Sequence, residues 1–199
     1  DENGRYFGEE FTLVLSSLQW LSKHPNTSCA TNLSTSRMID DVAKQYDCKS
    51  YRSAVGEANV AGTMKEHGCV IGGEGNGGVI FPKVCWVRDS LSGMALVLDL
   101  MRERNEKLST IVNSIQKYEM TKRTIDLAEL GGIPAIEKEI ERLKETYANE
   151  RLDDSDGLRI DFDEGWVHVR PSNTEPIARV IAEAKDSLTA YKLANRIKL

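Results

Sequence analysis

The alternation of short apolar segments with longer amphipathic segments in the first hundred residues constrains the fold more than any other feature. Residues 9–21 predict a helix with one buried stripe, formed by Phe11, Val14, Leu15, Leu18 and Leu21. Short strands are predicted at 28–31, 49–52 and 68–71, with helices between them at 34–46 and 57–66. Because parallel strands need crossover connections, which are usually helical, this order predicts a layered α/β domain.

Two local signals complete the prediction for this part of the chain. Ser34 is expected to cap the helix that ends at Tyr46. A glycine-dense loop is expected at Gly72–Gly78, and Asp89 is expected to cap a further helix that runs to Arg104. The inward face of that helix is predicted to consist of apolar residues at helical spacing, namely Leu91, Ala95, Leu98 and Met101.

Beyond about Tyr118 the pattern changes to a helix followed by consecutive strands. Ile136, Ile140, Leu143 and Tyr147 have the spacing of an amphipathic surface helix. Residues 158–162 and 167–169 alternate apolar and polar side chains around the turn at 163–165, which predicts a hairpin. A third strand is expected at 178–184, and Asp186 is expected to cap a last helix.

The predicted fold class is an α/β layered domain at residues 1–118, followed by a smaller α+β domain at 119–199. In the second domain the consecutive strands should form an antiparallel sheet with helices on one side. The linker is predicted near Ser114–Lys122.

Charge and cysteine content exclude several classes of protein. With 26 Lys and Arg against 31 Asp and Glu, the formal net charge is −5, which argues against a nucleic-acid partner. The sequence has no apolar run that approaches the roughly 18 residues of a membrane-spanning helix, and we predict no membrane partner. The four cysteines lack the close spacing of a zinc site, so we expect reduced, mostly buried thiols in a cytoplasmic protein.

The first residues contain a hairpin signal without a partner strand. Asn3-Gly4 is typical of a two-residue turn, yet only Asp1 and Glu2 precede it, and no initiating Met is present. We expect the sequence to be part of a longer chain; the alternative is a frayed terminus with an accidental Asn-Gly pair.

The segment Arg170-Pro171-Ser172-Asn173-Thr174-Glu175-Pro176 carries the densest chemistry in the chain. A guanidinium offers a planar fork of charged donors that matches two phosphate oxygens, and hydroxyl and backbone N–H groups of a tight turn can bind the others. The two prolines stiffen the loop on either side. The segment therefore predicts a phosphate-binding loop, with an ordinary polar turn between strands as the alternative.

Gly73, Gly75 and Gly78 match G-x-G-x-x-G, but their context excludes a dinucleotide site. That motif must open into a helix, whereas residues 79–82 are β-like and end in proline; Val79 also stands where a Walker A loop needs lysine. A carboxylate and an amide among glycines suit a sugar, because Glu74 can accept from two adjacent hydroxyl groups and Asn76 can donate and accept. The alternative is a flexible glycine loop with Glu74 in solvent.

Other patterns give no site. Residues 153–157 do not fit the register of an EF-hand and are interpreted as a polar turn. The three histidines show no ligand spacing, and no catalytic nucleophile is identified.

Together the two loops resemble those of the α-D-phosphohexomutase family, which comprises phosphoglucomutases, phosphomannomutases and phosphoglucosamine mutases. In that family a Gly-Glu-x-Ser-Gly-His sugar loop in the third of four domains precedes an Arg-x-Ser-Asn/Gly-Thr-Glu-Pro phosphate loop in the fourth. The resemblance extends to residues 55–57 and 88–91, so it covers nearly the whole chain as the third and fourth domains.

The resemblance implies which residues bind substrate. Substrate phosphate would be held by Arg170, Ser172, Asn173 and Thr174. The sugar hydroxyls would be bound by Glu74 and Asn76, with Gly75 and Gly77 admitting close backbone contact. Glu57 and Arg179 are further candidates. The sugar loop departs from the family form, because Asn76 replaces serine and Gly78 replaces histidine.

The resemblance also implies the activity of the longer protein. It would interconvert the 1-phosphate and 6-phosphate of a hexose or hexosamine through a hexose 1,6-bisphosphate intermediate, with Mg²⁺ bound outside this segment. The phosphoserine and magnesium loops of the family belong to its N-terminal domains, which would be partners in the same chain. We therefore expect this segment alone to be inactive, with its two loops facing one substrate. The alternative is a noncatalytic α+β binding or assembly module whose phosphate loop is structural.

Overall fold

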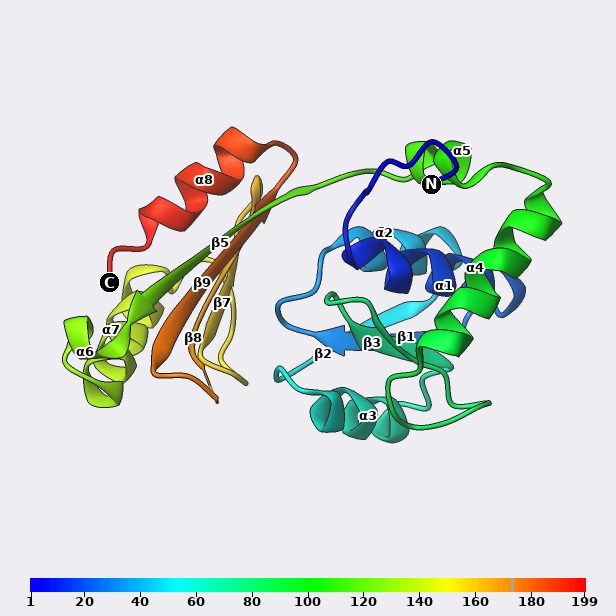
Figure 1. Cartoon of the computed structure of the whole chain (residues 1–199). Coiled ribbons are helices and arrows are strands. Elements are labelled where there is room, and N and C mark those ends of the chain that lie inside the picture. Colours follow the sequence, from blue (N-terminus) through cyan, green and yellow to red (C-terminus); the bar gives the residue numbers. More distant parts are fainter. Residues whose placement is uncertain (173) are drawn as a thin grey trace. The chain divides into compact units, whose positions relative to one another are not determined.

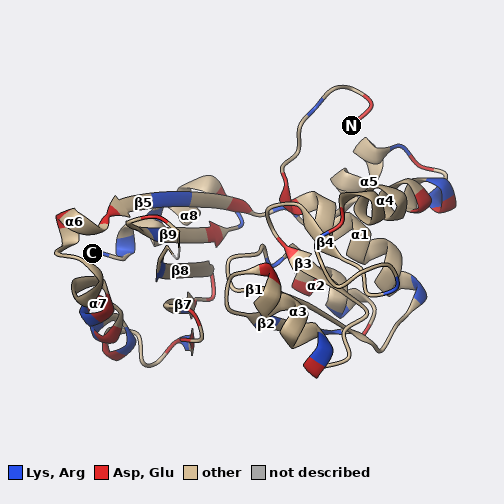
Figure 2. Cartoon of the chain, turned by 60° about the horizontal axis from the view of Figure 1, so that its bottom comes forward, with Lys and Arg blue, Asp and Glu red and all other residues tan. Residues whose placement is uncertain are grey.

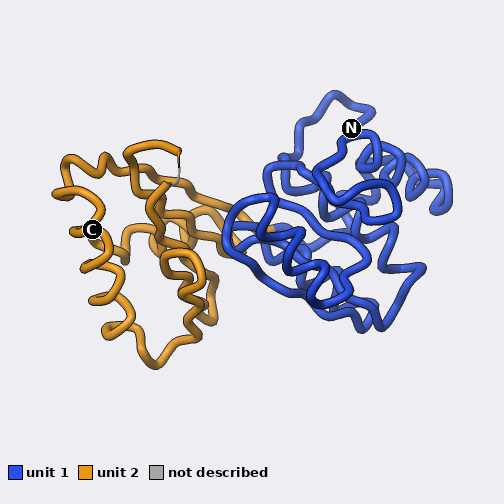
Figure 3. Tube along the Cα trace, turned by 90° about the horizontal axis from the view of Figure 1, so that it is seen from below, with its two compact units in different colours: residues 1–117 blue, residues 118–199 orange. Residues whose placement is uncertain are grey.

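The computed structural model describes residues 1–172 and 174–199. These residues form two compact units, Asp1–Lys117 and Tyr118–Leu199 (Figure 3). None of the described helices is long and apolar enough to cross a membrane.

The first unit is built on a four-stranded mixed sheet in the order β2-β1-β3-β4 (Figure 1). β1 (Ser28–Asn32) pairs in parallel with β2 (Lys49–Ser53) and with β3 (Ile71–Glu74), and β4 (Gly78–Ile80) pairs antiparallel with β3. All five residues of β1 are buried, as expected for the central strand of a parallel sheet covered on both faces. The predicted α/β layered domain is confirmed.

Five helices surround this sheet. α1 (Glu10–Lys23) and α2 (Met38–Gln45) lie on one face and α3 (Glu57–Glu66) on the other (Figure 1). α4 (Ser90–Arg104) and the short α5 (Leu108–Ser114) complete the unit. The predicted cap of α4 is confirmed, because the Asp89 carboxylate accepts from Ser92 N at 2.9 Å and from Leu91 N at 3.3 Å.

The predicted inward face of α4 is wrong. Leu91 and Leu98 are 70% and 65% exposed, and the buried residues of α4 are Ser92, Gly93, Leu96 and Leu100. The reason is a close approach: a Cβ on Gly93 would lie 3.3 Å from Val79 Cγ2 of β4 and 3.5 Å from Thr12 Cγ2 of α1. The contact face of this helix therefore contains the small residues Ser92 and Gly93 together with Leu96 and Leu100.

Two boundaries also differ from the prediction. α2 begins at Met38 rather than after Ser34, because residues 33–36 form a turn in which Ser36 Oγ accepts from Met38 N at 3.2 Å. The strand predicted at 68–71 runs instead from Ile71 to Glu74, so Gly72 and Gly73 are strand residues and not loop residues. Gly72 lies where a Cβ would be 2.5 Å from both Ala30 O and Met64 Sδ, so only glycine fits between β1 and α3.

The second unit contains a five-stranded antiparallel sheet in the order β5-β9-β8-β7-β6. The predicted hairpin is formed by β7 (Leu158–Asp161) and β8 (Gly165–Pro171), and the predicted third strand is β9 (Ile177–Ala184). β5 (Glu119–Asp126) and β6 (Arg151–Asp153) form the two edges. Glu119–Lys122, predicted as linker, belong to β5, so that part of the linker prediction is wrong.

Helices α7 (Ile133–Thr146) and α8 (Ser187–Arg196) cover one face of this sheet, and the single turn α6 (Leu127–Leu130) precedes α7. Their buried residues pack on alternate residues of the strands, such as Val167 and Val169 of β8. The other surface of α7 carries charges of both signs (Figure 2), including the pairs Glu139–Arg142 and Glu141–Lys144. Asp186 caps α8 as predicted, since its Oδ1 accepts from Thr189 N at 2.9 Å. The predicted α+β architecture, with helices on one side, is confirmed.

Candidate functional site

Glu74 ends β3, and its carboxylate is buried at 5% exposure. Oε1 accepts from Asn32 Nδ2 at 2.8 Å and from the backbone N–H of Gly56 at 3.2 Å. Oε2 lies 3.3 Å from Arg88 Nη1. The alternative of a flexible loop with Glu74 in solvent is therefore wrong.

These contacts limit what Glu74 can bind. A carboxylate has about four lone-pair sites, two on each oxygen. Asn32 and Gly56 fill both sites of Oε1, whereas Arg88 lies beside Oε2 as an ion pair and donates no hydrogen bond to it. The oxygen of Glu74 that can still accept hydrogen bonds from a ligand is thus Oε2.

Arg88 links Glu74 to Glu57. Its Nε donates to Glu57 Oε2 at 2.6 Å, while its Nη1 is the group beside Glu74. The side chain of Arg88 is 41% exposed and that of Glu57 31% exposed, so both reach the surface next to the buried Glu74. Glu57, a predicted candidate, is thereby placed in the network of the sugar loop, and Arg88 is a member that the sequence did not indicate as a site residue.

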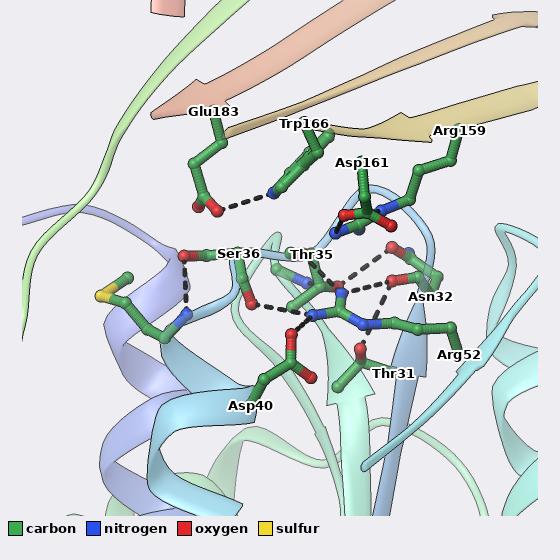
Figure 4. A network of polar contacts seen from close by, with 12 residues as sticks. Thr31, Asn32, Thr35, Ser36, Asp40, Arg52, Arg159, Asp161, Trp166 and Glu183 are labelled. Atoms are coloured by element: carbon green, nitrogen blue, oxygen red, sulfur yellow. Dashed lines mark hydrogen bonds and ion pairs between the residues drawn. The ribbon is translucent and has the colours of Figure 1, made fainter. Parts of the chain in front are cut away.

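The turn after β1 supports the same loop (Figure 4). Thr35 Oγ1 accepts from the backbone N–H of Gly75 at 3.0 Å and donates to Asn32 Oδ1 at 3.0 Å. The guanidinium of Arg52 fixes this turn: Nη1 donates to Asn32 O at 3.0 Å and to Thr35 O at 2.6 Å, and Nη2 donates to Ser36 O at 3.3 Å. The sequence could have indicated Asn32 and Thr35 as site residues, because they are polar residues at and just after the end of a buried strand.

The other predicted residues of the sugar loop follow Glu74 in the tight connection to β4. Asn76 is exposed, and its Oδ1 accepts from Gly78 N at 3.3 Å, which leaves its amide nitrogen as the outward donor. Gly77 has φ 89°, which favours glycine. A Cβ on the buried Gly75 would lie 2.0 Å from Glu10 Oε1, so a side chain at this position would displace the carboxylate of Glu10.

The phosphate loop connects β8 to β9 in the second unit. In the register of these strands Arg170 lies directly opposite Arg179, so both side chains project from the same face of the sheet at the mouth of the loop. Arg170 Nη1 donates to Pro171 O at 3.0 Å, and Nε lies 3.9 Å from Asp156 Oδ2, which is too long for a hydrogen bond. Arg179 forms an ion pair with the exposed Glu175.

The loop is closed by backbone contacts. Ser172 N donates to Ile177 O at 2.8 Å, and Ile177 N donates to Glu175 O at 2.8 Å. Thr174 is exposed, and its N–H lies 3.5 Å from Ser172 Oγ. The structure therefore brings Arg170, Ser172 and Thr174 into one loop; the predicted Asn173 lies outside the described residues.

A second turn packs under the base of this loop. His168 is fully buried, and its Nε2–H donates to Asp156 O at 2.7 Å, which fixes the tautomer. Burial lowers the pKa of His168 to about 4. Gly157 has φ 69°, and a Cβ there would lie 2.2 Å from Val169 O and 2.6 Å from Arg170 Cβ. The Asp156-Gly157 turn thus fits closely against the strand that carries Arg170.

The same face of β8 carries a row of polar groups that the sequence analysis did not identify. Trp166 Nε1 donates to Glu183 Oε1 at 2.7 Å, and the guanidinium carbon of Arg159 lies 4.3 Å from the centroid of the Trp166 ring (Figure 4). Arg159 also pairs with Asp161 at 3.0 Å. The available signal was the alternation of Trp166, His168 and Arg170 with the valines of β8, which predicts one polar face for all three.

Among the residues that the structure describes, no group of three or more His, Cys, Asp or Glu side chains is arranged to hold a metal ion.

Comparison with known sequences decides the family. Residues 9–118 match the profile described as "Phosphoglucomutase/phosphomannomutase, alpha/beta/alpha domain III", and residues 125–199 match "Phosphoglucomutase/phosphomannomutase, C-terminal domain". The chain belongs to the phosphoglucomutase/phosphomannomutase family. Its two units correspond to the third and the C-terminal domain of this family, which confirms the resemblance inferred from the two loops.

Individual members of the phosphoglucomutase/phosphomannomutase family agree with this assignment. A phosphoglucomutase/phosphomannomutase of Thermococcus kodakarensis is 36% identical over 93% of the chain and 40% of that protein. A phosphoglucosamine/phosphogalactosamine mutase of Sulfurisphaera tokodaii is 30% identical over 100% of the chain and 44% of that protein. The chain therefore spans less than half the length of these curated relatives.

Solved structures of the family share the fold. A phosphoglucomutase/phosphomannomutase family protein of Burkholderia thailandensis superposes with a TM-score of 0.81 at 19% identity, covering 98% of this chain and 41% of that one. An Aspergillus fumigatus N-acetylphosphoglucosamine mutase, solved in complex with GlcNAc-6P and magnesium, superposes with a TM-score of 0.67 at 16% identity, covering 99% and 44%.

Proposed function

We propose that this chain is the substrate-binding half of a phosphohexomutase that interconverts the 1-phosphate and 6-phosphate of a hexose or hexosamine. The phosphate loop of the second unit would hold the phosphate group that is not reacting. The sugar loop of the first unit would bind sugar hydroxyl groups. A hexose 1,6-bisphosphate would be the intermediate. The phosphate loop would therefore bind the 1-phosphate in one orientation of the sugar and the 6-phosphate in the other.

The pairing of Arg170 with Arg179 is the observation that carries this proposal. Like charges directly opposite each other destabilise a sheet unless they are neutralised; here Glu175 pairs with Arg179 and Asp156 lies 3.9 Å from Arg170, and a bound anion would add to this compensation. A phosphate between the two guanidinium groups would supply negative charge and would accept hydrogen bonds from their N–H groups. Ser172 and Thr174 are placed in the same loop, where their hydroxyl groups can donate to the remaining oxygens.

The sugar loop supports selective binding of a few hydroxyl groups. Glu74 Oε2 can accept from hydroxyl groups, and the amide nitrogen of the exposed Asn76 can donate. The sequence predicted that Glu74 would accept from two adjacent hydroxyls, and Oε2 is the oxygen that remains for them.

Catalysis would require the rest of the protein. Relatives in this family include an Aspergillus fumigatus enzyme solved with GlcNAc-6P and magnesium, and a variant of that enzyme solved with glucose 1,6-bisphosphate. We infer that the N-terminal domains supply the phosphoserine and the Mg²⁺ site, and that this segment alone is inactive.

A coupled assay on the intact protein tests the proposal. Glucose 1-phosphate, mannose 1-phosphate and glucosamine 1-phosphate are supplied in turn, and formation of the 6-phosphate is followed. We expect turnover of at least one of them by the intact protein, loss of turnover in Arg170→Ala, and none by residues 1–199 alone. Absence of turnover with all three, together with unchanged stability in the presence of each sugar phosphate, would instead support the noncatalytic module.

A further inference from the structure

The stem of Arg88 occupies the space over Gly78. A Cβ placed on Gly78 would lie 2.1 Å from Arg88 Cδ and 2.9 Å from Arg88 Cγ. Contacts below 3.0 Å require a shift, and here the neighbour is the middle of a side chain whose far end is fixed by two carboxylates. Position 78 and Arg88 therefore cannot both carry their own side chain in this arrangement.

The guanidinium of Arg88 has two separate anchors. Nε donates to Glu57 Oε2 at 2.6 Å, and Nη1 lies 3.3 Å from Glu74 Oε2. Two different nitrogens of one rigid fork make these contacts, whereas a lysine would have to reach both carboxylates with one nitrogen. Arg88 also compensates the charge of Glu74, because a buried carboxylate is costly without a cation or several donors.

The orientation of Glu74 depends on both of its oxygens. Asn32 and Gly56 hold Oε1, whereas Arg88 is the group that fixes Oε2 among the described residues. Oε2 is the atom that retains an acceptor site for a ligand. The direction in which that site points is therefore set by Arg88.

We propose that Arg88 is the residue that positions Glu74 and so sets the sugar specificity of this loop. The side chain of Arg88 can lie beside Glu74 because Gly78 has no side chain in that space. The inference rests on the proposed function, since it assigns Arg88 to recognition of the sugar and not of the phosphate. In the common form of the loop a histidine stands at position 78; in this chain a residue ten positions later fills that space.

The test compares steady-state kinetics of variants of the intact protein on the sugar phosphate that the wild type turns over best. Arg88→Met removes the cation. Gly78→Ala keeps the arginine at position 88 but displaces the aliphatic part of its side chain. Both should raise KM about tenfold, the effect of losing one charge-assisted hydrogen bond. Changes in kcat should be smaller than the change in KM, and Arg88→Lys should fall between Arg88→Met and the wild type.

Two matched controls separate positioning from general damage. Arg102→Met removes another exposed arginine that pairs with carboxylates, Asp99 and Glu103, on α4. Gly62→Ala changes a glycine whose Cβ would meet no atom within 4 Å. Both should retain wild-type KM. Binding of inorganic phosphate, measured by calorimetry, should be unchanged in Arg88→Met and in Gly78→Ala.

The double variant Gly78→His/Arg88→Ala adds a steric test. Gly78→His alone should raise KM more than Arg88→Ala alone, whereas the double variant should be no worse than Arg88→Ala, since the imidazole then has room. If the effects of the two substitutions on KM are additive in the double variant, the side chains at positions 78 and 88 do not compete for the same space.

The possible failures are distinct. If the wild type turns over a sugar phosphate but Arg88→Met and Gly78→Ala keep its KM, the role of Arg88 is disproved while the proposed function stands. If the wild type turns over no sugar phosphate, both fail. Should Arg88→Met not fold, the KM of Gly78→Ala decides, because that variant retains both charged anchors.

Discussion

Arg170 and Arg179 are cross-strand neighbours in β8 and β9, and their two guanidinium groups share one face at the mouth of the loop that joins these strands. Such a pair is unfavourable by itself and favourable around an anion. Glu175 pairs with Arg179, so a bound phosphate would compete with that carboxylate.

Arg179→Met should weaken phosphate binding without destabilising the protein. Loss of one charge-assisted contact should raise the Kd for inorganic phosphate by about tenfold or more. Relief of the like-charge contact should leave the free energy of unfolding within about 0.5 kcal/mol of the wild type. Calorimetric titration and urea denaturation measure the two quantities. Arg196→Met, which removes the surface pair with Glu164, should affect neither. An unchanged Kd in Arg179→Met would contradict its assignment to the loop.

Gly157→Ala should damage the base of the phosphate loop. The new Cβ would meet the backbone oxygen of Val169 at 2.2 Å and Arg170 Cβ at 2.6 Å, in addition to the strain of its φ of 69°. Gly68→Ala has a similar φ of 61° but open space around it, so it isolates the cost of φ alone, about 1 kcal/mol. Urea denaturation should show that Gly157→Ala costs about 1–3 kcal/mol more than Gly68→Ala. Equal costs would mean that the turn can move away from Arg170.

His168 should make the protein less stable in mild acid. Burial lowers the pKa of the imidazole to about 4, with Asp156, Arg159 and Arg170 nearby. The unfolded chain, with a pKa near 6.5, then binds more protons than the folded one between these values, so the free energy of unfolding falls as pH drops from about 6.5 to about 4. The contribution lost across this window is up to about 3 kcal/mol. In urea denaturation at several pH values, His168→Gln should flatten this dependence, and the exposed His67→Gln should retain it.

Arg52→Met should loosen the turn that supports the sugar loop. The variant loses donors to three backbone oxygens, those of Asn32, Thr35 and Ser36, and leaves them buried without these partners. We expect a loss of about 2–4 kcal/mol in the free energy of unfolding. Hydrogen exchange at Gly75 N–H, which donates to Thr35, should become faster. Arg102→Met, at the exposed end of α4, should change neither quantity; slow exchange at Gly75 in Arg52→Met would show that the turn holds by itself.

Local signals predicted most of the fold. The caps Asp89 and Asp186 were found because one side chain bonds the first turn of its own helix, and α7 was found because its stripe of Ile136, Ile140 and Leu143 is periodic. The hairpin of β7 and β8 followed from alternation across a short turn. In each case the determining contacts lie within a few residues.

Other elements could not be predicted because distant contacts determine them. The buried face of α4 is chosen by the approach of Gly93 to β4 and α1, not by the large apolar residues Leu91 and Leu98. β5 is a polar edge strand with exposed residues along its length, so it lacks the hydrophobic pattern of a strand.

The candidate site likewise contains residues that local sequence predicts and residues that depend on distant contacts. Arg170, Ser172 and Thr174 lie within five residues and were predicted as one loop. Glu74 was predicted from its glycine neighbours, but its partners Asn32 and Gly56 are supplied by the ends of other elements. Arg88 reaches Glu74 from beyond β4, and its position depends on the absence of a side chain at Gly78.

The proposed function requires that Arg170 and its loop bind the phosphate group of a sugar phosphate, and that the Glu74 loop bind sugar hydroxyl groups. The most direct test is NMR titration of the ¹⁵N-labelled chain with glucosamine 6-phosphate, with glucosamine as the matched ligand without phosphate. We predict amide shifts at residues 170–177 and at 74–78 with the phosphate ester, and loss of those at 170–177 in Arg170→Ala. Shifts that are the same with and without Arg170, or none at either loop in the wild type at millimolar ligand, would contradict the claim.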